Sequence, residues 1–535
     1  MRPLVQTVRA IPPQWLIVYL GSLVYLCGLV PFAMMGAADK NMLSVFNIDE
    51  FLVYNVVDTM LKADLRHFLD PIQQVYGYLY HFLNAVALML TRPINGLVGL
   101  SPARFDVLVL RELTAIYYLA AVILFLRTIF AKATAWSVVF AWIALITLPV
   151  TFAASNLLHP DNLAFLFMVG SLVLLVRDRN QFGWKFWIAA IVWGLAINTK
   201  MYGIFLFPMF AFYCGRSAVL GEATWRASAF RLGYAGLVAV VIFLLTMPFL
   251  IFGDNLRDFV RALFSYSATY VTGTRNVVSE PTPLVWYRTV IERFYFHWSF
   301  LICIAVGLVC LARSSGRDCA LLLVAFLPMF LHFVLNVSWA WFWYLIPTLV
   351  PLVACAFFVP TQLSLRSWQL WLFLAVSPIA IWQIWHNSNA TLAAAQARLQ
   401  SEATDPSISL YRKVESLLGS RLTKVHSVFR DPFAYVPDTD GVRVSMKWGL
   451  ATYDNLIVER GSNEGLVDLV VLQKEYIGRC SSEDSLRRYM DYMKQSFEEN
   501  RPCISFYSDA AAHKLKGFVF LTETDFGVAF IRQGL

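Results

Sequence analysis

Long apolar stretches recur along the first 386 residues of this chain. Many of them hold about 18 or more residues, which is the length needed to cross the hydrocarbon of a bilayer. Hydrophobic residues make up 58% of the 535 residues and charged residues only 15%, whereas a soluble domain carries about a quarter charged residues. The sequence therefore predicts a polytopic α-helical membrane protein.

Eleven of these stretches are predicted to be membrane spans, and the loops between them decide their orientation. The stretch at 76–90 carries Tyr and His residues that suit an interfacial helix better than a span. With that choice, the Lys and Arg residues of the later short loops fall on one face, which the positive-inside rule makes cytoplasmic. The N-terminus is then cytoplasmic, and the net charge of +8 requires no nucleic-acid partner. The expected spans lie near 14–36, 107–130, 135–154, 160–176, 185–199, 201–215, 231–252, 294–313, 319–337, 341–360 and 368–386.

The composition changes near His386, because the residues that follow are much richer in charge than those that precede. We therefore predict a transmembrane domain over 1–386, with long outer loops at 37–106 and 253–293, and an extracytoplasmic soluble domain over 387–535. Helical and strand-like runs are mixed in this tail, which favours a small α/β domain. The helical runs lie at 410–419 and 482–500, and the strand-like runs at 466–472 and 517–521.

Two of the eight cysteines, Cys480 and Cys503, lie in the polar tail. If the tail is outside a bacterial cell membrane, it meets an oxidising compartment, and the two are candidates for a disulfide. A pair of buried thiols is the alternative. The other six cysteines lie in or beside apolar stretches and are most simply small core residues. No Cys/His spacing typical of a metal site occurs.

An acidic pair, Asp49-Glu50, follows the first span. A carboxylate just outside the membrane can ionise and act as a base toward an acceptor hydroxyl. The alternative is structural, because Asp49 precedes an apolar run over 51–61 and could be the N-cap of a helix.

A lysine, Lys200, stands between two short apolar stretches in the run Asn198-Thr199-Lys200-Met201-Tyr202-Gly203. The two stretches, 185–199 and 201–215, are expected to be half-length helices that meet near it. A lysine at such a position is costly unless it faces an anion or a cavity, and a lipid phosphate is an obvious partner. Snorkelling of the ammonium to the interface is the alternative.

Two further sites fall on the outer face under this topology. Arg111, followed by Glu112, opens the second span and could hold a phosphate with two hydrogen bonds. An ion pair within the helix, or an interface anchor, is the alternative. The run His159-Pro160-Asp161-Asn162 joins two spans, and its alternative is a helix cap with Pro at the first turn.

Other polar residues of the outer loops are weaker candidates for binding substrate or a divalent cation. None of them has metal-ligand spacing, so the sequence predicts no cofactor with certainty and leaves a divalent cation open. They are His67, Asp70, Arg275, Glu280, Glu292 and His297.

The order of these motifs resembles that of a known enzyme family. An acidic pair after the first span is followed by Val75-Tyr76-Gly77-Tyr78-Leu79-Tyr80, then Arg111, then Pro160-Asp161 at an outer turn, and then the run that ends in Lys200. Near the end, Tyr344-Leu345-Ile346-Pro347 and Pro351 match a recurring Tyr-x-x-Pro-x-x-x-Pro helix. Over roughly residues 14–360 the chain resembles the GT-C fold of integral-membrane glycosyltransferases. More narrowly, it resembles the bacterial branch related to protein O-mannosyltransferases and the lipid A aminoarabinose transferase.

The resemblance implies an inner-membrane enzyme with a polyprenyl-phosphate-linked sugar as donor. It implies that Asp49, with Glu50 as the less certain partner, is the catalytic carboxylate. Lys200 and Arg111 would lie near the donor phosphate. One position departs from the family, because Trp343 stands where many members have an Arg before the Tyr of the late helix; Arg275 or Arg293 would then have to replace that cation. The remaining substrate-binding candidates are Tyr76, Tyr80, His159, Asp161, Asn162, Tyr202 and Tyr344.

The predicted reaction is a single displacement with inversion at the sugar carbon, in which Asp49 deprotonates or orients the acceptor hydroxyl. The sugar, the oligomeric state and the acceptor remain open; the acceptor could be a glycolipid, a polysaccharide or a protein. A secondary transporter or flippase of lipid-linked sugars is the alternative function, with Asp49 and Lys200 as ion or substrate sites. A third possibility is a structural partner in an envelope complex.

Overall fold

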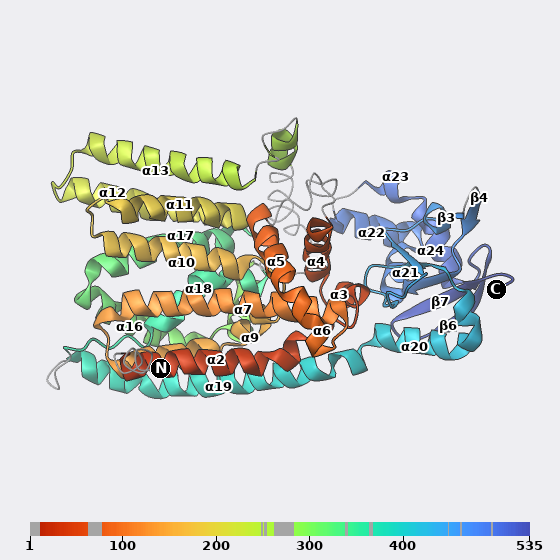
Figure 1. Cartoon of the computed structure of the whole chain (residues 1–535), viewed down its shortest axis with the longest axis horizontal. Coiled ribbons are helices and arrows are strands. Elements are labelled where there is room, and N and C mark those ends of the chain that lie inside the picture. Colours follow the sequence, from red (N-terminus) through yellow and green to blue (C-terminus); the bar gives the residue numbers. More distant parts are fainter. Residues whose placement is uncertain are drawn as a thin grey trace.

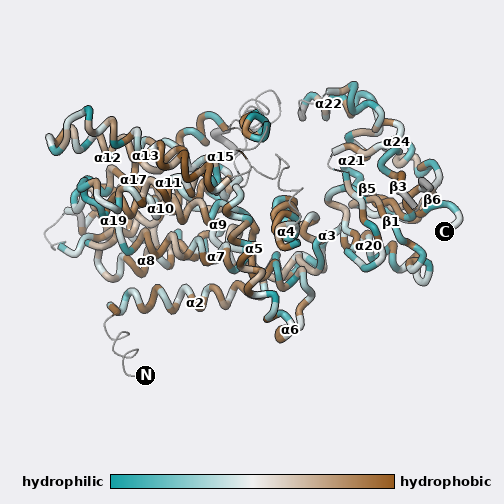
Figure 2. Tube along the Cα trace, turned by 45° about the horizontal axis from the view of Figure 1, so that its top comes forward, coloured by the Kyte–Doolittle hydropathy of each residue, from teal (hydrophilic) through white to brown (hydrophobic). Residues whose placement is uncertain are grey.

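The computed structural model describes residues 11–62, 77–247, 250, 254–261, 283–337, 341–362, 368–447, 449–460, 463–493 and 496–535. Figure 1 shows a bundle of long helices at one end of the molecule and a smaller part that contains the β-strands at the other. The helices of the bundle are mostly apolar, while hydrophilic and hydrophobic residues are mixed along the strand-containing part (Figure 2). This division follows the change of composition in the sequence.

The bundle is built from helices that bury one large apolar core and also expose apolar side chains outward. Helices that are hydrophobic all round are typical of membrane spans. The bundle comprises α2 (Pro13–Ala33), α7 (Pro102–Ile129), α8 (Ala135–Ile146), α9 (Pro149–Ser155), α10 (Asp161–Asp178), α11 (Trp184–Thr199), α12 (Phe207–Val219), α13 (Trp225–Thr246), α15 (Pro283–Phe294), α16 (Leu301–Ser314), α17 (Gly316–Asn336), α18 (Ile346–Cys355) and α19 (Trp368–Thr404).

Each of the eleven expected spans coincides with a helix or a broken helix, but their number as spans is not confirmed. Within the described residues, four helices are long and apolar enough to cross a membrane by themselves: 13–33, 102–132, 225–246 and 316–336. Two bent pairs would raise this number to six. One pair is α8 with α9, bent by 61°, and the other joins 287–294 to 298–314 at 79°. The multi-pass helical class predicted from the sequence is confirmed.

The expected break at Lys200 is present. Helix α11 ends at Thr199, Lys200 is extended, and the short 3-10 helix η5 (Met201–Leu206) leads into α12. Gly203 lies so close to α11 that a Cβ there would come within 2.7 Å of the Ala196 backbone. Glycine allows this close approach, and it holds the break tightly against the preceding helix.

Several short helices lie across the end of the bundle nearest the strand-containing part, instead of along it (Figure 1). One of them, α5, covers most of the stretch predicted to be interfacial. Asn47 is the N-cap of α4, since its side-chain oxygen accepts the backbone N–H of Asp49 at 2.8 Å and of Glu50 at 3.3 Å. The alternative that Asp49 itself caps this helix is therefore wrong. The short helices are α3 (Lys40–Phe46), α4 (Ile48–Leu61), α5 (Tyr78–Thr91), η3 (Arg92–Ile94) and α6 (Asn95–Val98).

The C-terminal part is an α/β unit, as the sequence predicts. Its five-stranded sheet has the order β2-β1-β5-β7-β6; β2, β1 and β5 are parallel, while β7 and β6 run antiparallel to their neighbours. Alternate strand residues face two separate apolar cores, so Val428 packs toward α20 and Phe429 toward α21 to α24. The strands are β1 (Ser427–Arg430), β2 (Arg443–Met446), β5 (Leu469–Gln473), β6 (Phe518–Glu523) and β7 (Gly527–Arg532), with a separate hairpin β3 (Ile457–Arg460) and β4 (Asn463–Leu466).

Helix α20 covers most of the expected helical run at 410–419, and α22 with α23 covers most of the run at 482–500, while α21 and α24 were not predicted. They are α20 (Pro406–Leu418), α21 (Lys474–Cys480), α22 (Glu483–Met493), α23 (Phe497–Asn500) and α24 (Cys503–Ala511). Cys480 and Cys503 are buried in one apolar core as free thiols. Their oxidation to a disulfide stays a prediction.

The two parts are joined by one continuous helix and by the first loop, which follows α2. Helix α19 runs along α2 and continues past the expected boundary at residue 386, so the strand-containing part begins only after Thr404 (Figure 1). Asp39 accepts a hydrogen bond from the Tyr435 hydroxyl at 2.8 Å, and Lys40 forms an ion pair with Asp438 at 3.2 Å. The first loop is therefore fastened to the C-terminal part.

Candidate active site

Glu50 and Arg111 form a buried ion pair, which we name the sealed cluster. Both side chains are almost fully buried, at 1% and 0% exposed. Arg111 donates from Nε and Nη2 to the two carboxylate oxygens, at 2.9 and 2.6 Å. Burial alone would raise the pKa of Glu50, but the adjacent guanidinium offsets this and holds the pKa below its usual value. Glu50 is thus an ionised, fully satisfied carboxylate.

The remaining hydrogen bonds of Arg111 show why it does not face a ligand. Its Nη1 donates to the backbone oxygens of Ala33, at 2.8 Å, and Met35, at 2.6 Å. With its guanidinium enclosed in this way, Arg111 has a structural partner in place of the donor phosphate that the sequence led us to expect. The partner is also not Glu112, the neighbour considered as an ion pair within the helix.

Glu50 also holds the turn that precedes α10. One of its oxygens accepts the backbone N–H of Leu158 at 2.8 Å. On the far side of the turn, the Asn162 side-chain amide donates to the backbone oxygens of Thr114 at 3.2 Å and Ala154 at 3.3 Å. Asn162 is buried, so its observed contacts fasten the turn between α7 and α9. The sealed cluster and Asn162 therefore fix the position of His159 and Asp161.

Asp49, His159, Asp161 and Lys200 form a second group, the open cluster. His159 Nδ1 contacts the carboxylate of Asp161, and its Nε2 lies 4.0 Å from Oδ2 of Asp49. Lys200 Nζ lies 3.8 Å from Oδ2 of Asp161. The hydroxyl of Tyr202 donates to the other Asp161 oxygen at 2.8 Å. Two carboxylates, an imidazole and an ammonium thus adjoin one another in the order Asp49, His159, Asp161, Lys200.

Aromatic rings border the open cluster. The ammonium of Lys200 lies 5.1 Å from the ring centre of Tyr344, within cation–π range. The His159 ring lies 5.0 Å from that of Trp343, which stacks in turn on Trp341 at 5.1 Å with the planes almost parallel. Trp343, at the position where the resemblance led us to expect an arginine, is therefore part of this wall.

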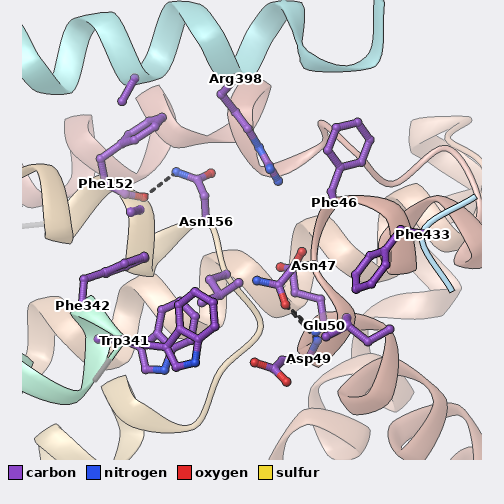
Figure 3. Close-up of a pocket in the computed structure, with 15 residues that line it drawn as sticks. Phe46, Asn47, Asp49, Glu50, Phe152, Asn156, Trp341, Phe342, Arg398 and Phe433 are labelled. Carbon is purple, nitrogen blue, oxygen red and sulfur yellow. Dashed lines mark hydrogen bonds between the residues drawn. The ribbon is translucent and has the colours of Figure 1, made fainter. Parts of the chain in front are cut away.

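A cavity of about 580 Å³ opens beside Asp49. Asp49 is 25% exposed, in contrast to its buried neighbour Glu50. Figure 3 shows Asp49 and Trp341 on one side of this cavity and the guanidinium of Arg398 on the other. The lining is mostly aromatic and apolar, with a few polar groups, which is typical of a ligand site. It consists of Phe46, Asn47, Ile48, Asp49, Glu50, Phe152, Ala153, Asn156, Leu157, Trp341, Phe342, Trp343, Ala394, Arg398 and Phe433.

The start of α5 touches the chain next to Lys200. Gly77 has a φ of +64°, and a Cβ at this position would lie 1.7 Å from the backbone oxygen of Asn198. The Asn198 side chain accepts the backbone N–H of Leu79 at 3.2 Å. The expected substrate-binding residue Tyr80 is fully buried in an apolar cluster, so it lies in the core of this region.

Two expected site residues, Tyr76 and Arg275, lie outside the described residues, as do His67, Asp70 and Glu280. Arg293, the other proposed replacement cation, is exposed and lies over the ring of Phe294. Among the described residues, no group of three or more His, Cys, Asp or Glu side chains could hold a metal ion. His297 caps the short helix η7 (Trp298–Phe300), and Glu292 pairs with Arg288.

Arg398 was not among the residues predicted from the sequence, because it comes from the part of α19 that was expected to belong to the soluble tail. Its Nη2 donates to the backbone oxygen of Met35 at 3.0 Å, and within the described chain its Nε has no hydrogen-bond partner. A half-buried arginine whose buried Nε keeps an unused donor beside a cavity is a candidate anion ligand. Phe433, from the C-terminal part, and Trp341 were also missed.

The fold defines the structural class of the protein. The chain is a multi-pass membrane protein with the GT-C fold of membrane glycosyltransferases. Two crystal structures of ArnT from Cupriavidus metallidurans align with it at TM-scores of 0.55 and 0.53 and sequence identities of 12% and 13%. The first is bound to undecaprenyl phosphate and the second is in the apo state; both alignments cover 96% of this chain and 97% of the other. No protein-family model and no curated protein sequence matches the chain.

Proposed function

We propose that this protein is a glycosyltransferase that moves a sugar from a polyprenyl-phosphate donor to a cell-envelope acceptor at the outer face of the membrane. The GT-C fold over almost the whole chain supports this class of function. The undecaprenyl phosphate bound to ArnT supports a lipid-linked donor. The observation that carries the proposal is local: Asp49 lines the cavity and is 25% exposed, while Glu50, at the edge of the same cavity, is 1% exposed and paired with Arg111.

Asp49 is the proposed catalytic base. As the acceptor oxygen attacks the sugar carbon, the bond from that carbon to the phosphate oxygen breaks and the acceptor hydroxyl proton passes to Asp49. The configuration at the carbon inverts. The leaving polyprenyl phosphate is already a stable anion, so this displacement needs no general acid. His159, held by Asp161, is the proposed positioning residue for the Asp49 carboxylate.

Charge that develops on the phosphate needs cations placed in advance. Lys200 is one candidate, because it is held near Asp161 and Tyr344 at the edge of the open cluster. Arg398 is the second, because it lines the cavity and keeps an unused donor. We assign to Arg398 the role that Arg275 or Arg293 was expected to fill in the absence of the family arginine.

The stacked pair Trp341 and Trp343 is a suitable platform for the sugar ring, since it presents flat apolar surface beside Asp49. The acceptor would then approach from the side of the C-terminal part, where Phe433 closes the cavity. This arrangement would give the C-terminal part a role in acceptor recognition. The acceptor itself, whether glycolipid, polysaccharide or protein, is left open by the proposal.

The test is a donor panel. The purified full-length protein in liposomes is incubated with polyprenyl-phosphate sugars of different kinds together with envelope extract, and release of free polyprenyl phosphate is measured. We expect release from one class of donor only, and a slower release by Arg398→Gln. Lys40→Gln serves as the matched control, since Lys40 pairs with Asp438 away from the cavity lining.

The same liposomes separate the enzyme from a flippase. If the donor crosses the bilayer while no donor in the panel releases polyprenyl phosphate, the transferase proposal is wrong and transport is favoured. Release without any sugar appearing on an acceptor would instead indicate a hydrolase.

A further inference from the structure

Two adjoining cavities lie at the end of the bundle opposite the candidate active site. Helix α10 begins with Asp161 of the open cluster and carries Arg177 in its last turn. Most of its 18 residues separate the two, which corresponds to about 25 Å along the axis. Helix α7 repeats this arrangement, with Arg111 in the sealed cluster and Arg127 in its last turn. The hydrocarbon of a bilayer is about 30 Å thick, so these cavities belong to the other membrane surface.

The larger cavity, of about 500 Å³, has a strongly basic lining. Five of its residues are cationic, and Asp318 is the single carboxylate that lines it. The smaller cavity, of about 330 Å³, shares Lys132 and Ser314 with it and adds Arg313. The cations of the larger cavity are Arg127, Lys132, Arg177, Arg179 and Arg317.

Two of these cations are hydrogen-bonded to neutral groups instead of carboxylates. Lys132 Nζ donates to the backbone oxygen of Ser314 at 3.3 Å, and Arg177 Nη2 to the Thr128 hydroxyl at 3.2 Å. Arg317 is the exception, because it pairs with Asp318 at 2.9 Å. The described part of the chain shows no carboxylate within ion-pair distance of the other four. Like charges gathered around one concavity repel one another, and an anion in the cavity would relieve that repulsion.

Aromatic and apolar groups surround the basic cavities at the level expected for lipid headgroups. The guanidinium of Arg127 lies 5.4 Å from the ring centre of Trp15, and that of Arg313 lies 4.6 Å from Trp368. Tryptophan rings are enriched at the membrane–water interface. The walls between the cations are apolar, with Ile129, Val176 and Leu311 among them.

We propose that these two cavities form a binding site for the phosphate headgroup of an anionic phospholipid, on the membrane face opposite the active site. Basic pockets between transmembrane helices on the cytoplasmic side are a recurring form of such a site. The positive-inside rule makes this face cytoplasmic. Two adjoining cavities that share Lys132 match a headgroup with two phosphates, such as that of cardiolipin. The site joins the ends of α7, α10, α16 and α17, so a bound headgroup would tie these helices together. This proposal stands apart from the proposed sugar transfer.

The test is native mass spectrometry of the full-length, delipidated protein in detergent, titrated with cardiolipin or with phosphatidylcholine. We expect saturable binding of cardiolipin and none of phosphatidylcholine at the same concentration. The double variant Lys132→Gln with Arg177→Gln removes two cations but keeps neutral hydrogen-bonding groups. Each cation near a membrane surface contributes about 1 kcal/mol to anionic-lipid binding, so affinity should fall about 30-fold.

A matched variant and a free-phosphate titration complete the test. Arg226→Gln removes a cation of the same bundle end that lines neither cavity, and it should bind cardiolipin like the wild type. If the double variant does not fold, Arg179→Gln replaces it, and a weaker loss of cardiolipin binding is expected. Equal binding of both lipids, or unchanged binding by the cavity variants, would overturn the proposal. Saturable binding of inorganic pyrophosphate with displacement of cardiolipin at equal concentration would assign the site to free phosphate instead.

Discussion

The sealed cluster and the open cluster occupy the same end of the bundle and are built from adjacent residues, yet their surroundings are opposite. In the sealed cluster, both Glu50 oxygens and all three nitrogens of the Arg111 guanidinium are hydrogen-bonded inside the protein. In the open cluster, Asp49 is partly exposed and lines a cavity. A single step along the first turn of α4 separates the two carboxylates.

The different surroundings of Glu50 and Asp49 show that the role of a charged side chain depends on its partners. A buried carboxylate whose hydrogen bonds are all made stays in one protonation state and stabilises the fold. A carboxylate that lies beside an imidazole and is open to solvent or to a cavity can exchange a proton, as a general base must. Asn47 contributes to this difference, because its side chain, and not that of Asp49, is the N-cap of α4.

The largest expected effect separates Asp49 from Glu50. Asp49→Asn should reduce polyprenyl phosphate release by about 100- to 10,000-fold, the usual contribution of a general base. The melting temperature should stay close to that of the wild type, because Asn has the shape of Asp and the backbone N–H of residue 49 still donates to the Asn47 side chain that caps α4. Glu50→Gln should show the reverse, with lower stability and nearly normal turnover in the folded fraction. Wild-type turnover by Asp49→Asn would show that Asp49 is not the general base, and the two clusters would then not differ in function.

The next effect concerns the fold. Arg111→Met leaves the Glu50 charge buried without its partner, and breaking a buried pair in this way costs about 3 to 5 kcal/mol. Unfolding in detergent should record the loss as a large fall in melting temperature. Arg104→Met is the matched control, because Arg104 pairs with Glu402 at 3.0 Å in a partly exposed position; such pairs contribute up to about 1 kcal/mol. Equal losses in the two variants would mean that the sealed cluster is no more than a surface pair.

Much of the fold was predictable because the signals are local. Apolar length marked the helices of the bundle, and alternating strand-like runs marked the α/β part. The break at Lys200 was visible as a polar residue between two short apolar stretches. The span count was not predictable in the same way, because bends such as that between α8 and α9 depend on packing.

The partners in the site were less predictable, because they come from distant segments. Nothing local indicates that Arg111 pairs with Glu50 across 61 positions. By contrast, two misreadings had local signals. Asn47 is as good an N-cap as Asp49, and the Ala-rich run after residue 386 favours continuation of α19, which would have brought Arg398 to the bundle.

A smaller effect tests how the open cluster is held in place. Gly77→Ala puts a Cβ into the backbone of Asn198 at a residue with positive φ, which should cost more than about 1 kcal/mol. The displaced segment adjoins Lys200, so donor KM should rise together with the loss of stability. Gly96→Ala is the control, since a Cβ there meets nothing within 4 Å in helix α6. An unchanged donor KM in Gly77→Ala would show that the start of α5 does not help to position Lys200 for donor binding.

Another buried carboxylate, Asp431 after β1, differs from Glu50 in its partners. Asp431 accepts hydrogen bonds from the Gln473 backbone at 2.7 Å and the Tyr507 hydroxyl at 3.3 Å. In the described residues it has no carboxylate–cation contact like that of Glu50. Burial raises the pKa of Asp431 to about 7, and these hydrogen bonds and the neighbouring Arg430 offset only part of that rise. The pKa of Glu50 moves in the opposite direction.

The two carboxylates should therefore give opposite pH dependence. The folded state holds the Asp431 proton more tightly than the unfolded state, whose carboxyl has a pKa of about 3.9. Stability of the C-terminal part should then fall as pH rises from about 4 to 7, with a slope of at most about 1.4 kcal/mol per pH unit.

Asp431→Asn should flatten this slope in thermal unfolding measured across the interval, while Asp454→Asn, at an exposed position, should leave it unchanged. Glu50 contributes stability that is present above its unfolded pKa and is lost only as pH falls through its lowered folded pKa. The contrary outcome is a stability that rises with pH through this interval and is unaffected by Asp431→Asn. It would show that Asp431 stays ionised in the folded protein without a paired cation.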